Sequence, residues 1–333
     1  MAFREILTRL PAVVGPTASG KTALALALGK RLGAEIVSCD SMQIYREMDI
    51  GTAKPTKEEQ AVLPHHLIDL LPPGTSYSAA DYAADAYRAV TDILARGRLP
   101  LFCGGTGLYL EAARRGGEEN SEIPGATAVR EALAAEAAAL GTQALWEKLA
   151  QVDPAAAAAT HPNNIRRVIR ALEIYKTTGI PKSEWDRRTR ERPPALHILP
   201  FMITYPDREL LYSRMDARVD EMLRAGLVEE AERLYRQGHL APGSTAAQAI
   251  GYKELLPYLR GECDLPTARK ALCLATRHYA KRQLTWFERD ESIVRLPATG
   301  EGGRLRSAEE LAEEALLLFQ KKCREEGRVK REE

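Results

Sequence analysis

The sequence predicts an α/β fold in which a mostly parallel sheet is covered by helices on both faces. Short apolar runs bounded by turn residues recur along the chain, at 10–14, 35–40, 65–70, 99–105 and 195–205. Segments with helical spacing of apolar residues separate most of these runs. This alternation is typical of parallel sheets, because a parallel connection needs a crossover that is usually a helix.

The first predicted strand and the helix after it enclose a glycine-containing turn. The strand "LPAVV" ends at Gly15, and the segment 22–33 is rich in strong helix formers. A second helix is expected over 78–97, where Ser78 and Asp81 match a variant of the capping box. Strand, glycine loop and helix therefore follow one another at the start of the chain.

A long segment with helical spacing and no strand pattern interrupts the predicted α/β domain. Residues 1–115 and 196–315 are predicted to form the α/β core with C-terminal helices, and 116–195 an all-helical insertion domain. We expect only helices after Asp207, followed by a charged tail over 316–333.

The composition is that of an ordinary globular protein. Of 333 residues 28% are charged, the net charge is +1, and five cysteines are scattered without C-x-x-C spacing, which argues against a disulfide framework or a zinc site. Neither a secretory pattern nor a long apolar stretch is present, so we expect a cytoplasmic protein that does not bind membranes. Any nucleic-acid surface must come from local clusters of Lys and Arg.

The strongest motif is "GPTASGKT", which matches the G-x-x-x-x-G-K-[ST] phosphate-binding loop. Backbone N–H groups in such a loop point at phosphate oxygens, Lys21 adds a full charge, and the Thr22 hydroxyl is suited to hold Mg²⁺. The motif extends the prediction to a core like that of P-loop NTPases, but it does not identify what is attached to the phosphates. The residues expected to bind a di- or triphosphate are Gly15, Pro16, Thr17, Ala18, Ser19, Gly20, Lys21 and Thr22.

An acidic residue follows the second predicted strand. Asp40 is expected at the carboxyl edge of the sheet, on the same rim as the phosphate loop. It could hold a metal, accept a proton from an incoming nucleophile, or cap the next turn.

Two basic clusters suggest an anionic partner. Arg166, Arg167 and Arg170 are predicted to lie together on one helix face. The second cluster has no acidic residue between Asp264 and Glu288, and its residues are Arg269, Lys270, Arg277, Lys281 and Arg282, with Tyr279, Trp286 and Phe287 interleaved. Basic and aromatic groups together suit phosphate contact with base stacking, although Trp286 and Phe287 fit core packing equally well. We interpret Glu229, Glu230, Glu232 and Arg233 as a solvated helix face.

Nine segments in order resemble the tRNA dimethylallyltransferase family. They are "GPTASGKT", "SCDSMQIYREMDIGTAKP", "HHLIDL", "YSAADY", "GGTGLYL", "RRVIRALEIY", "GLVEEAERLY", "AIGYKE" and "KRQLTWF", and they run from about residue 11 to residue 290. The resemblance implies transfer of a dimethylallyl group from dimethylallyl diphosphate to N6 of adenosine 37 beside the anticodon, with Mg²⁺ at Thr22.

The resemblance also implies site residues. Asp40 would be the general base, Thr106 would act beside it, and Arg218 would clamp the departing diphosphate. The residues implied to contact tRNA are Asp40, Ser41, Met42, Gln43, Thr106, Arg130, Arg166, Arg167, Arg170, Gln248, Gly251, Tyr252, Lys253, Lys281 and Arg282. The insertion domain would bind the anticodon stem-loop, and we expect a monomer.

Two other functions also fit the phosphate loop. In a P-loop small-molecule kinase or NTPase, Asp69 would hold the metal and Asp40 would activate a hydroxyl. In a nucleotide-gated RNA-binding module, no chemistry would follow binding. Neither a kinase nor an NTPase gives a role to the basic helix from Arg269 to Arg282.

Overall fold

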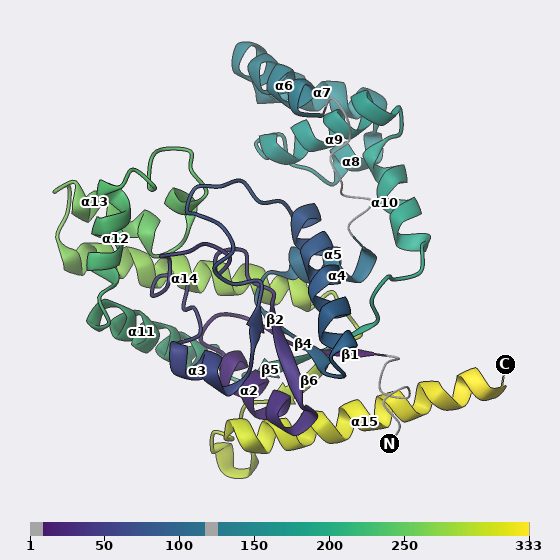
Figure 1. Ribbon diagram of the computed structural model, residues 1–333. Coiled ribbons are helices and arrows are strands. Elements are labelled where there is room, and N and C mark those ends of the chain that lie inside the picture. The colour runs from purple at the N-terminus through teal and green to yellow at the C-terminus, as the bar shows by residue number, and fades with distance from the viewer. Residues whose placement is uncertain (1–8, 117–125, 333) are drawn as a thin grey trace. The chain divides into compact units, whose positions relative to one another are not determined.

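The computed structural model describes residues 9–116 and 126–332. Contacts within the chain divide it into two units, 1–114 with 196–333 and 115–195 (Figure 1). The start of the expected insertion, 117–125, lies outside the described residues. Each unit has its own hydrophobic core.

The first unit contains a six-stranded sheet in which every pairing is parallel. Its strands are β1 (Leu10–Val14), β2 (Ala34–Ser38), β3 (His65–His66), β4 (Leu99–Gly104), β5 (Ile198–Thr204) and β6 (Val294–Pro297). The order across the sheet is β3-β2-β4-β1-β5-β6. The predicted α/β fold is confirmed.

Two strands differ from the prediction. Only His65–His66 of the expected strand 65–70 pairs with the sheet, because Leu67 and Asp69 have positive φ angles that an extended strand does not allow. The expectation of helices alone after Asp207 is wrong, since β6 pairs with β5 along its length. Arg295 interrupts the apolar run of this strand and hides it in the sequence.

Helices cover both faces of the sheet. The connections β1–α2–β2 and β3–α4–β4 run in opposite directions across it, and right-handed crossovers therefore place α2 and α4 on opposite faces. Ser78 forms the predicted capping box with Asp81 at the start of α4. The helices in the N-terminal part of this unit are α2 (Lys21–Leu32), α3 (Lys57–Val62), α4 (Ala79–Ala95) and α5 (Gly107–Arg115).

The C-terminal part of this unit is helical apart from β6. Its helices are α11 (Arg208–Arg224), α12 (Leu227–Arg236), α13 (Tyr252–Leu259), α14 (Leu265–Phe287) and α15 (Ala308–Glu332). A second apolar core joins α12, α13 and α14 to the loop after β2, through residues such as Met48, Leu227 and Tyr252. That loop carries part of the site described below.

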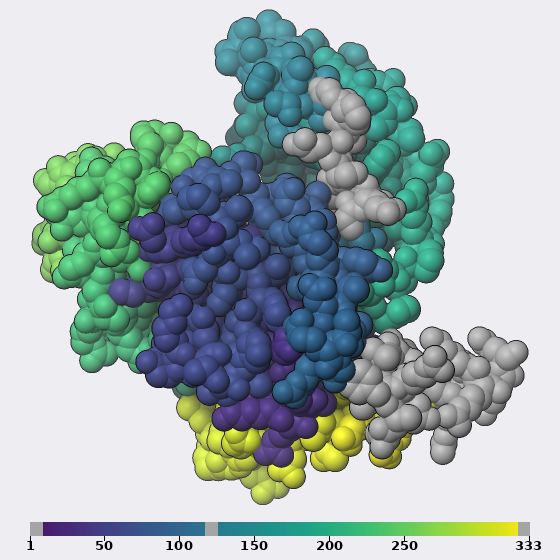
Figure 2. Space-filling view, in the orientation of Figure 1, coloured from purple at the N-terminus to yellow at the C-terminus, as the bar shows by residue number. Residues whose placement is uncertain are grey.

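The last helix does not change character at the expected boundary of 316. It packs along α2, and in Figure 2 its yellow residues lie against purple residues of the N-terminal part of the chain. Phe319 and Cys323 are buried in the main core, so residues 316–323 of the expected tail belong to the fold. No helix in the described ranges is both long enough and apolar enough to cross a membrane.

The second unit is helical throughout its described residues. It contains α6 (Ala126–Leu140), α7 (Thr142–Val152), α8 (Pro154–Ala158), α9 (Ile165–Thr178) and α10 (Lys182–Glu191). Leu133, Leu149, Val168 and Leu172 are central to its own apolar core. Its amphipathic helices therefore bury one face against each other rather than against a sheet.

Candidate active site

The phosphate loop joins β1 to the start of α2. Gly20 precedes the helix with φ of 92°, and Ala18 has φ of 60°, a left-handed conformation that is uncommon for a residue with a side chain. Among the described side chains, the hydroxyl of Ser19 is a buried polar group without a hydrogen-bond partner. The loop therefore keeps a strained backbone and an unused donor at the N-terminus of a helix.

Two side chains from the C-terminal half hold carbonyl groups of this loop. The hydroxyl of Tyr205 donates to the Ser19 carbonyl at 2.9 Å, and Nε of Arg214 donates to the Ala18 carbonyl at 3.1 Å. The Arg214 guanidinium also stacks over the Tyr205 ring, 5.9 Å from its centroid. With the carbonyls used in this way, the loop can direct its N–H groups at an anion.

Gln283 of α14 joins the phosphate loop to the turn after β4. Its Oε1 accepts from the Thr17 N–H at 3.1 Å, and its Nε2 donates to the Gly105 carbonyl at 2.9 Å. Gln283 is not among the residues predicted from the sequence, although it lies three residues after Ala280 and four before Phe287, which are also buried. That spacing places Gln283 on the inner face of the helix.

Thr106, after β4, hydrogen-bonds the residues on either side of Asp40, after β2. The Thr106 N–H donates to the Cys39 carbonyl at 3.0 Å, and Thr106 Oγ1 accepts from the Ser41 N–H at 3.0 Å. The Asp40 carboxylate accepts from the Met42 N–H at 3.0 Å, which leaves its second oxygen for another partner.

The close approach of these strand ends depends on glycine. A Cβ atom on Gly104 would lie 2.1 Å from the Cys39 carbonyl oxygen, so no larger residue fits there. Burial, and then the charge of Asp40, raise the pKa of the Tyr279 hydroxyl on α14. The Arg282 guanidinium stacks over the Tyr279 ring, 5.5 Å from its centroid.

The side chain of Gln43 lies between the turn after β2 and the phosphate loop. Its Oε1 accepts from the Ser38 hydroxyl at 3.1 Å, and it lines a small cavity together with Lys21 and Thr22. The structure therefore brings residues expected on the tRNA side close to residues expected to bind diphosphate.

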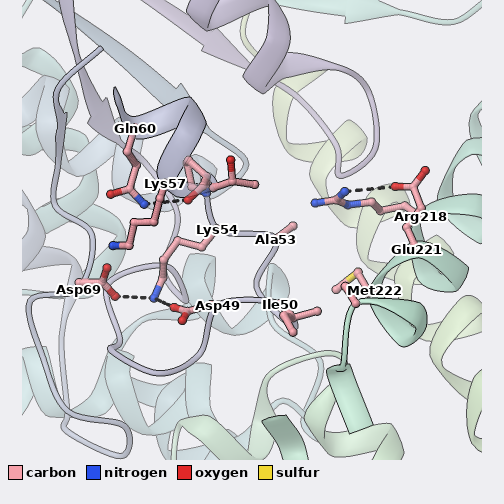
Figure 3. A pocket seen from close by; sticks show the side chains of 13 residues that line it. Asp49, Ile50, Ala53, Lys54, Lys57, Gln60, Asp69, Arg218, Glu221 and Met222 are labelled. Atoms are coloured by element: carbon pink, nitrogen blue, oxygen red, sulfur yellow. Dashed lines mark hydrogen bonds and ion pairs between the residues drawn. The ribbon is translucent and has the colours of Figure 1, made fainter. Parts of the chain in front are cut away.

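Arg218 lies one helical turn after Arg214 and lines a different pocket, of about 300 Å³. Figure 3 shows Arg218 directed toward Glu221, with which it pairs at 3.2 Å, while Lys54 lies across the pocket. Arg214, which the sequence analysis missed, is the arginine that contacts the phosphate loop.

Asp69 is already engaged by a lysine in the wall of the same pocket. The Lys54 ammonium is buried and pairs with Asp69 at 2.5 Å and with Asp49 at 2.6 Å (Figure 3). This pairing gives Asp69 a structural role, in place of the metal site that a kinase would need.

Several basic residues expected to meet an anion have carboxylate partners in the fold. Arg269 pairs with Asp220 at 2.5 Å and Arg277 pairs with Asp216, so the apparent excess of charge on α14 is partly balanced by α11. Lys281 and Arg282 are exposed, and no described carboxylate lies within ion-pair distance of either.

In the second unit, too, basic residues expected to meet an anion pair with a carboxylate of the fold. The carboxylate of Glu173 is buried and accepts from Arg130 at 2.9 and 3.0 Å and from Arg170 at 2.6 Å. Arg166 and Arg167 are exposed on α9. The four arginines therefore differ in role, because Arg130 and Arg170 also stabilise the buried Glu173 carboxylate.

The predicted tRNA-contacting residues at the start of α13 differ in their exposure to solvent. Gln248 and Lys253 are exposed, whereas Gly251 and Tyr252 are buried. Tyr252 donates its hydroxyl to Glu230 at 2.6 Å, and burial raises the pKa of that hydroxyl. Direct contact of the Tyr252 side chain with tRNA is thus incompatible with this fold.

The interpretation of Glu230 as part of a solvated face is wrong. Its side chain is 4% exposed and accepts hydrogen bonds from the loop after β2. Leu227 and Leu234 lie three residues before and four after it, a spacing that places Glu230 on the buried stripe of α12.

Within the described ranges, no group of three or more His, Cys, Asp or Glu side chains could hold a metal ion. The residues lining the small cavity that have side-chain oxygens are Thr22, Ser38 and Gln43. Such neutral oxygen donors fit Mg²⁺ that is carried largely by phosphate oxygens and completed by one protein hydroxyl.

Comparison with known proteins identifies the family. The family model described as IPP transferase matches residues 43–290, and the model described as isopentenyl transferase matches residues 8–68. Curated proteins named tRNA dimethylallyltransferase include one from Halorhodospira halophila, 48% identical over 86% of this chain and 92% of its own length, and one from Geobacillus kaustophilus, 45% identical over 91% and 95%.

Solved structures agree with these matches. The full-length tRNA isopentenylpyrophosphate transferase from Bacillus halodurans is 41% identical, with a TM-score of 0.71 over 97% of this chain and 99% of its own. A eukaryotic dimethylallyltransferase acting on tRNA is 27% identical, with a TM-score of 0.75 over 87% and 74%. The chain therefore belongs to the tRNA dimethylallyltransferase family.

Proposed function

We propose that this chain transfers the dimethylallyl group of dimethylallyl diphosphate to N6 of adenosine 37 in tRNA and releases diphosphate. The observation that carries the proposal is that Thr106 hydrogen-bonds the residues on either side of Asp40, on the sheet edge that bears the phosphate loop. A carboxylate and a diphosphate site then lie at one edge, as alkyl transfer between two substrates requires. We propose that the chain acts as a monomer, which light scattering would measure.

Asp40 is suited to act as the general base. The exocyclic amine of adenine is a weak nucleophile, because its lone pair is delocalised into the ring. A carboxylate that removes a proton during attack on the prenyl carbon assists this step by about 10²–10⁴-fold. Thr106 would keep Asp40 in place through its bond to the next residue, Ser41.

The phosphate loop is suited to hold the leaving diphosphate. The unused Ser19 hydroxyl would gain an acceptor from a phosphate oxygen, and Lys21 and Arg214 would oppose the negative charge as the bond to the prenyl carbon breaks. Thr22 would help hold Mg²⁺, which supplies further neutralisation of the diphosphate when bound. Arg218 would act from the neighbouring pocket, on the donor side.

Exposed polar groups of both units would contact the anticodon stem-loop. In the first unit these are Gln248, Lys253, Lys281 and Arg282, and in the second Arg166 and Arg167, with Arg130 and Arg170 contributing from their pairs with Glu173. The half-buried Ser41 and Met42, beside Asp40, would contact the target adenine. Adenosine 37 must leave its stack to reach Asp40, which costs a few kcal/mol. Many phosphate contacts would offset that cost.

The variant Asp40→Asn tests the proposal. It keeps the size of the side chain and the acceptor for Met42 but removes the base, so labelled prenyl diphosphate and tRNA should give about 10²–10⁴-fold slower transfer. Binding of inorganic diphosphate should be unchanged. Asp92→Asn, at an exposed position of α4, is the matched control.

Two results would contradict the proposal. Wild-type transfer rates in Asp40→Asn would exclude Asp40 as the base. Consumption of ATP by the wild-type chain, with no label entering tRNA, would favour the kinase alternative.

A further inference from the structure

The buried carboxylate of Glu230 binds three successive backbone N–H groups. It accepts from Asp49 at 3.0 Å, from Ile50 at 3.0 and 3.1 Å, and from Gly51 at 2.9 Å. The hydroxyl of Tyr252 donates to the same carboxylate at 2.6 Å. A buried carboxylate with four donors fixes a loop strongly, because each of these bonds is charge-assisted.

The next two residues of the same loop hold the side-chain amide of Gln43. Nε2 of Gln43 donates to the carbonyls of Thr52 at 3.4 Å and Ala53 at 3.2 Å, while its Oε1 accepts from Ser38. Both amide hydrogens of Gln43 are thereby used. The orientation of Gln43 depends on the position of residues 49–53, and that position depends on Glu230.

Gln43 connects this arrangement to the reaction. It lies three residues after Asp40, within the turn 41–44, and its side chain lines the small cavity with Lys21 and Thr22. A shift of the 49–53 loop would therefore move a side chain between the proposed base and the proposed diphosphate site. The phosphate loop itself is held independently, by Tyr205, Arg214 and Gln283.

We propose that Glu230 is a positioning residue for prenyl transfer, which acts through Gln43 on the turn that receives the target adenine. The proposal rests on the proposed function, because that function gives Asp40 and Gln43 their roles. It predicts that loss of the Glu230 carboxylate impairs use of tRNA without impairing the phosphate loop. A merely structural role would lower both together.

The first test compares Glu230→Gln with Glu229→Gln. Glu229 is the exposed neighbour on α12, so both variants make the same change in charge and size. Because misplacement of a reacting group by about 1 Å can cost 10²-fold, kcat/KM for tRNA should fall at least about tenfold in Glu230→Gln. It should change less than about twofold in Glu229→Gln, an exposed site without such contacts.

The phosphate loop provides the second readout. The affinity of Glu230→Gln for inorganic diphosphate with Mg²⁺, measured by calorimetry, should stay within about threefold of wild type, since separate side chains hold that loop. A parallel fall in diphosphate affinity and in tRNA use would overturn the proposal in favour of general structural damage. Equal activities of the two glutamine variants would also overturn it.

A double-mutant cycle tests the route through Gln43. If Glu230 acts through Gln43, the variant Glu230→Gln/Gln43→Ala should be no more than about twofold worse than the poorer single variant. Multiplied losses would show that the two residues act independently and would refute the proposed route.

Tyr252→Phe covers the case in which Glu230→Gln does not fold. It keeps the ring that packs against Gly51 and removes only one of the donors to Glu230. A smaller loss of kcat/KM for tRNA, again non-additive with Gln43→Ala, is expected; wild-type activity or additive losses would contradict the proposal. Wild-type chain that transfers no label to tRNA would instead refute the proposed function and remove the basis for the role of Glu230.

Discussion

Replacing Gln283 by Leu should loosen the phosphate loop without opening a cavity. Leucine has a similar volume, so the main loss is the pair of hydrogen bonds to Thr17 (3.1 Å) and Gly105 (2.9 Å). Each buried group left unsatisfied costs about 1–3 kcal/mol, so the free energy of unfolding should fall by about 2–6 kcal/mol. At about 2–4 °C per kcal/mol, Tm should fall by at least about 4 °C.

The same variant should lose activity because Gln283 fixes the phosphate loop through the Thr17 N–H, and that loop is proposed to bind the diphosphate. A loop displaced by about 1 Å can cost on the order of 10²-fold, so kcat/KM for the prenyl diphosphate should fall about 10–100-fold. Labelled transfer and thermal unfolding measure the two effects. Gln237→Leu, at the exposed end of α12, is the control.

Gln283→Glu separates position from charge. A carboxylate still accepts from Thr17 but cannot donate to Gly105, and it places a negative charge beside the diphosphate. Weaker diphosphate binding than in the leucine variant is expected. If Gln283→Leu matches Gln237→Leu in both activity and Tm, the hydrogen bonds of Gln283 to Thr17 and Gly105 contribute to neither stability nor transfer, and the prediction is refuted.

Three further predictions concern the diphosphate site and the second unit. Arg214→Gln should weaken binding of inorganic diphosphate about tenfold, more than Arg218→Gln does, and equal effects would contradict the assignment of Arg214 to the loop. Chelation by EDTA should lower transfer at least about 100-fold, with recovery on adding Mg²⁺, while activity that survives chelation would argue against a metal at Thr22. Burial opposes ionisation of Glu173, but Arg130 and Arg170 hold the pKa of its carboxyl below the ordinary 4.5. The stability that this carboxylate contributes is therefore present above about pH 4.5 and is lost as the pH falls through the lower pKa of the folded state. Hydrogen exchange in α9 of the full chain should show this acid dependence, and Glu173→Gln should flatten it.

Local patterns made much of the core predictable. β1, the phosphate loop and α2 follow directly from "LPAVV", the glycine positions and the run of helix formers, because each of these patterns lies within a few consecutive residues. The capping box of Ser78 is predictable for the same reason. Asp40 could be assigned to the right edge of the sheet because every parallel strand ends there.

Interactions between distant segments were not predictable in this way. The expected surplus of charge on α14 counted acids along one helix, whereas Asp216 and Asp220 approach from α11. Glu230 was misread because residue type was given more weight than its place on the apolar stripe of α12. Gln283 also lies on a buried stripe, so a polar residue at an apolar position is the pattern that would have found both.

The order of strands constrains how the chain reaches its folded state. β1 lies between β4 and β5, and β5 is made only after the whole second unit has been synthesised. The second unit has its own core, so it can assemble while the sheet is still incomplete. The packing of α2, the helix that follows the phosphate loop, is completed later still, because α15 covers it and is synthesised after the strands. Deletions at the C-terminus that reach Phe319 should therefore delay or prevent folding of the N-terminal phosphate loop, although the two segments stand at opposite ends of the sequence.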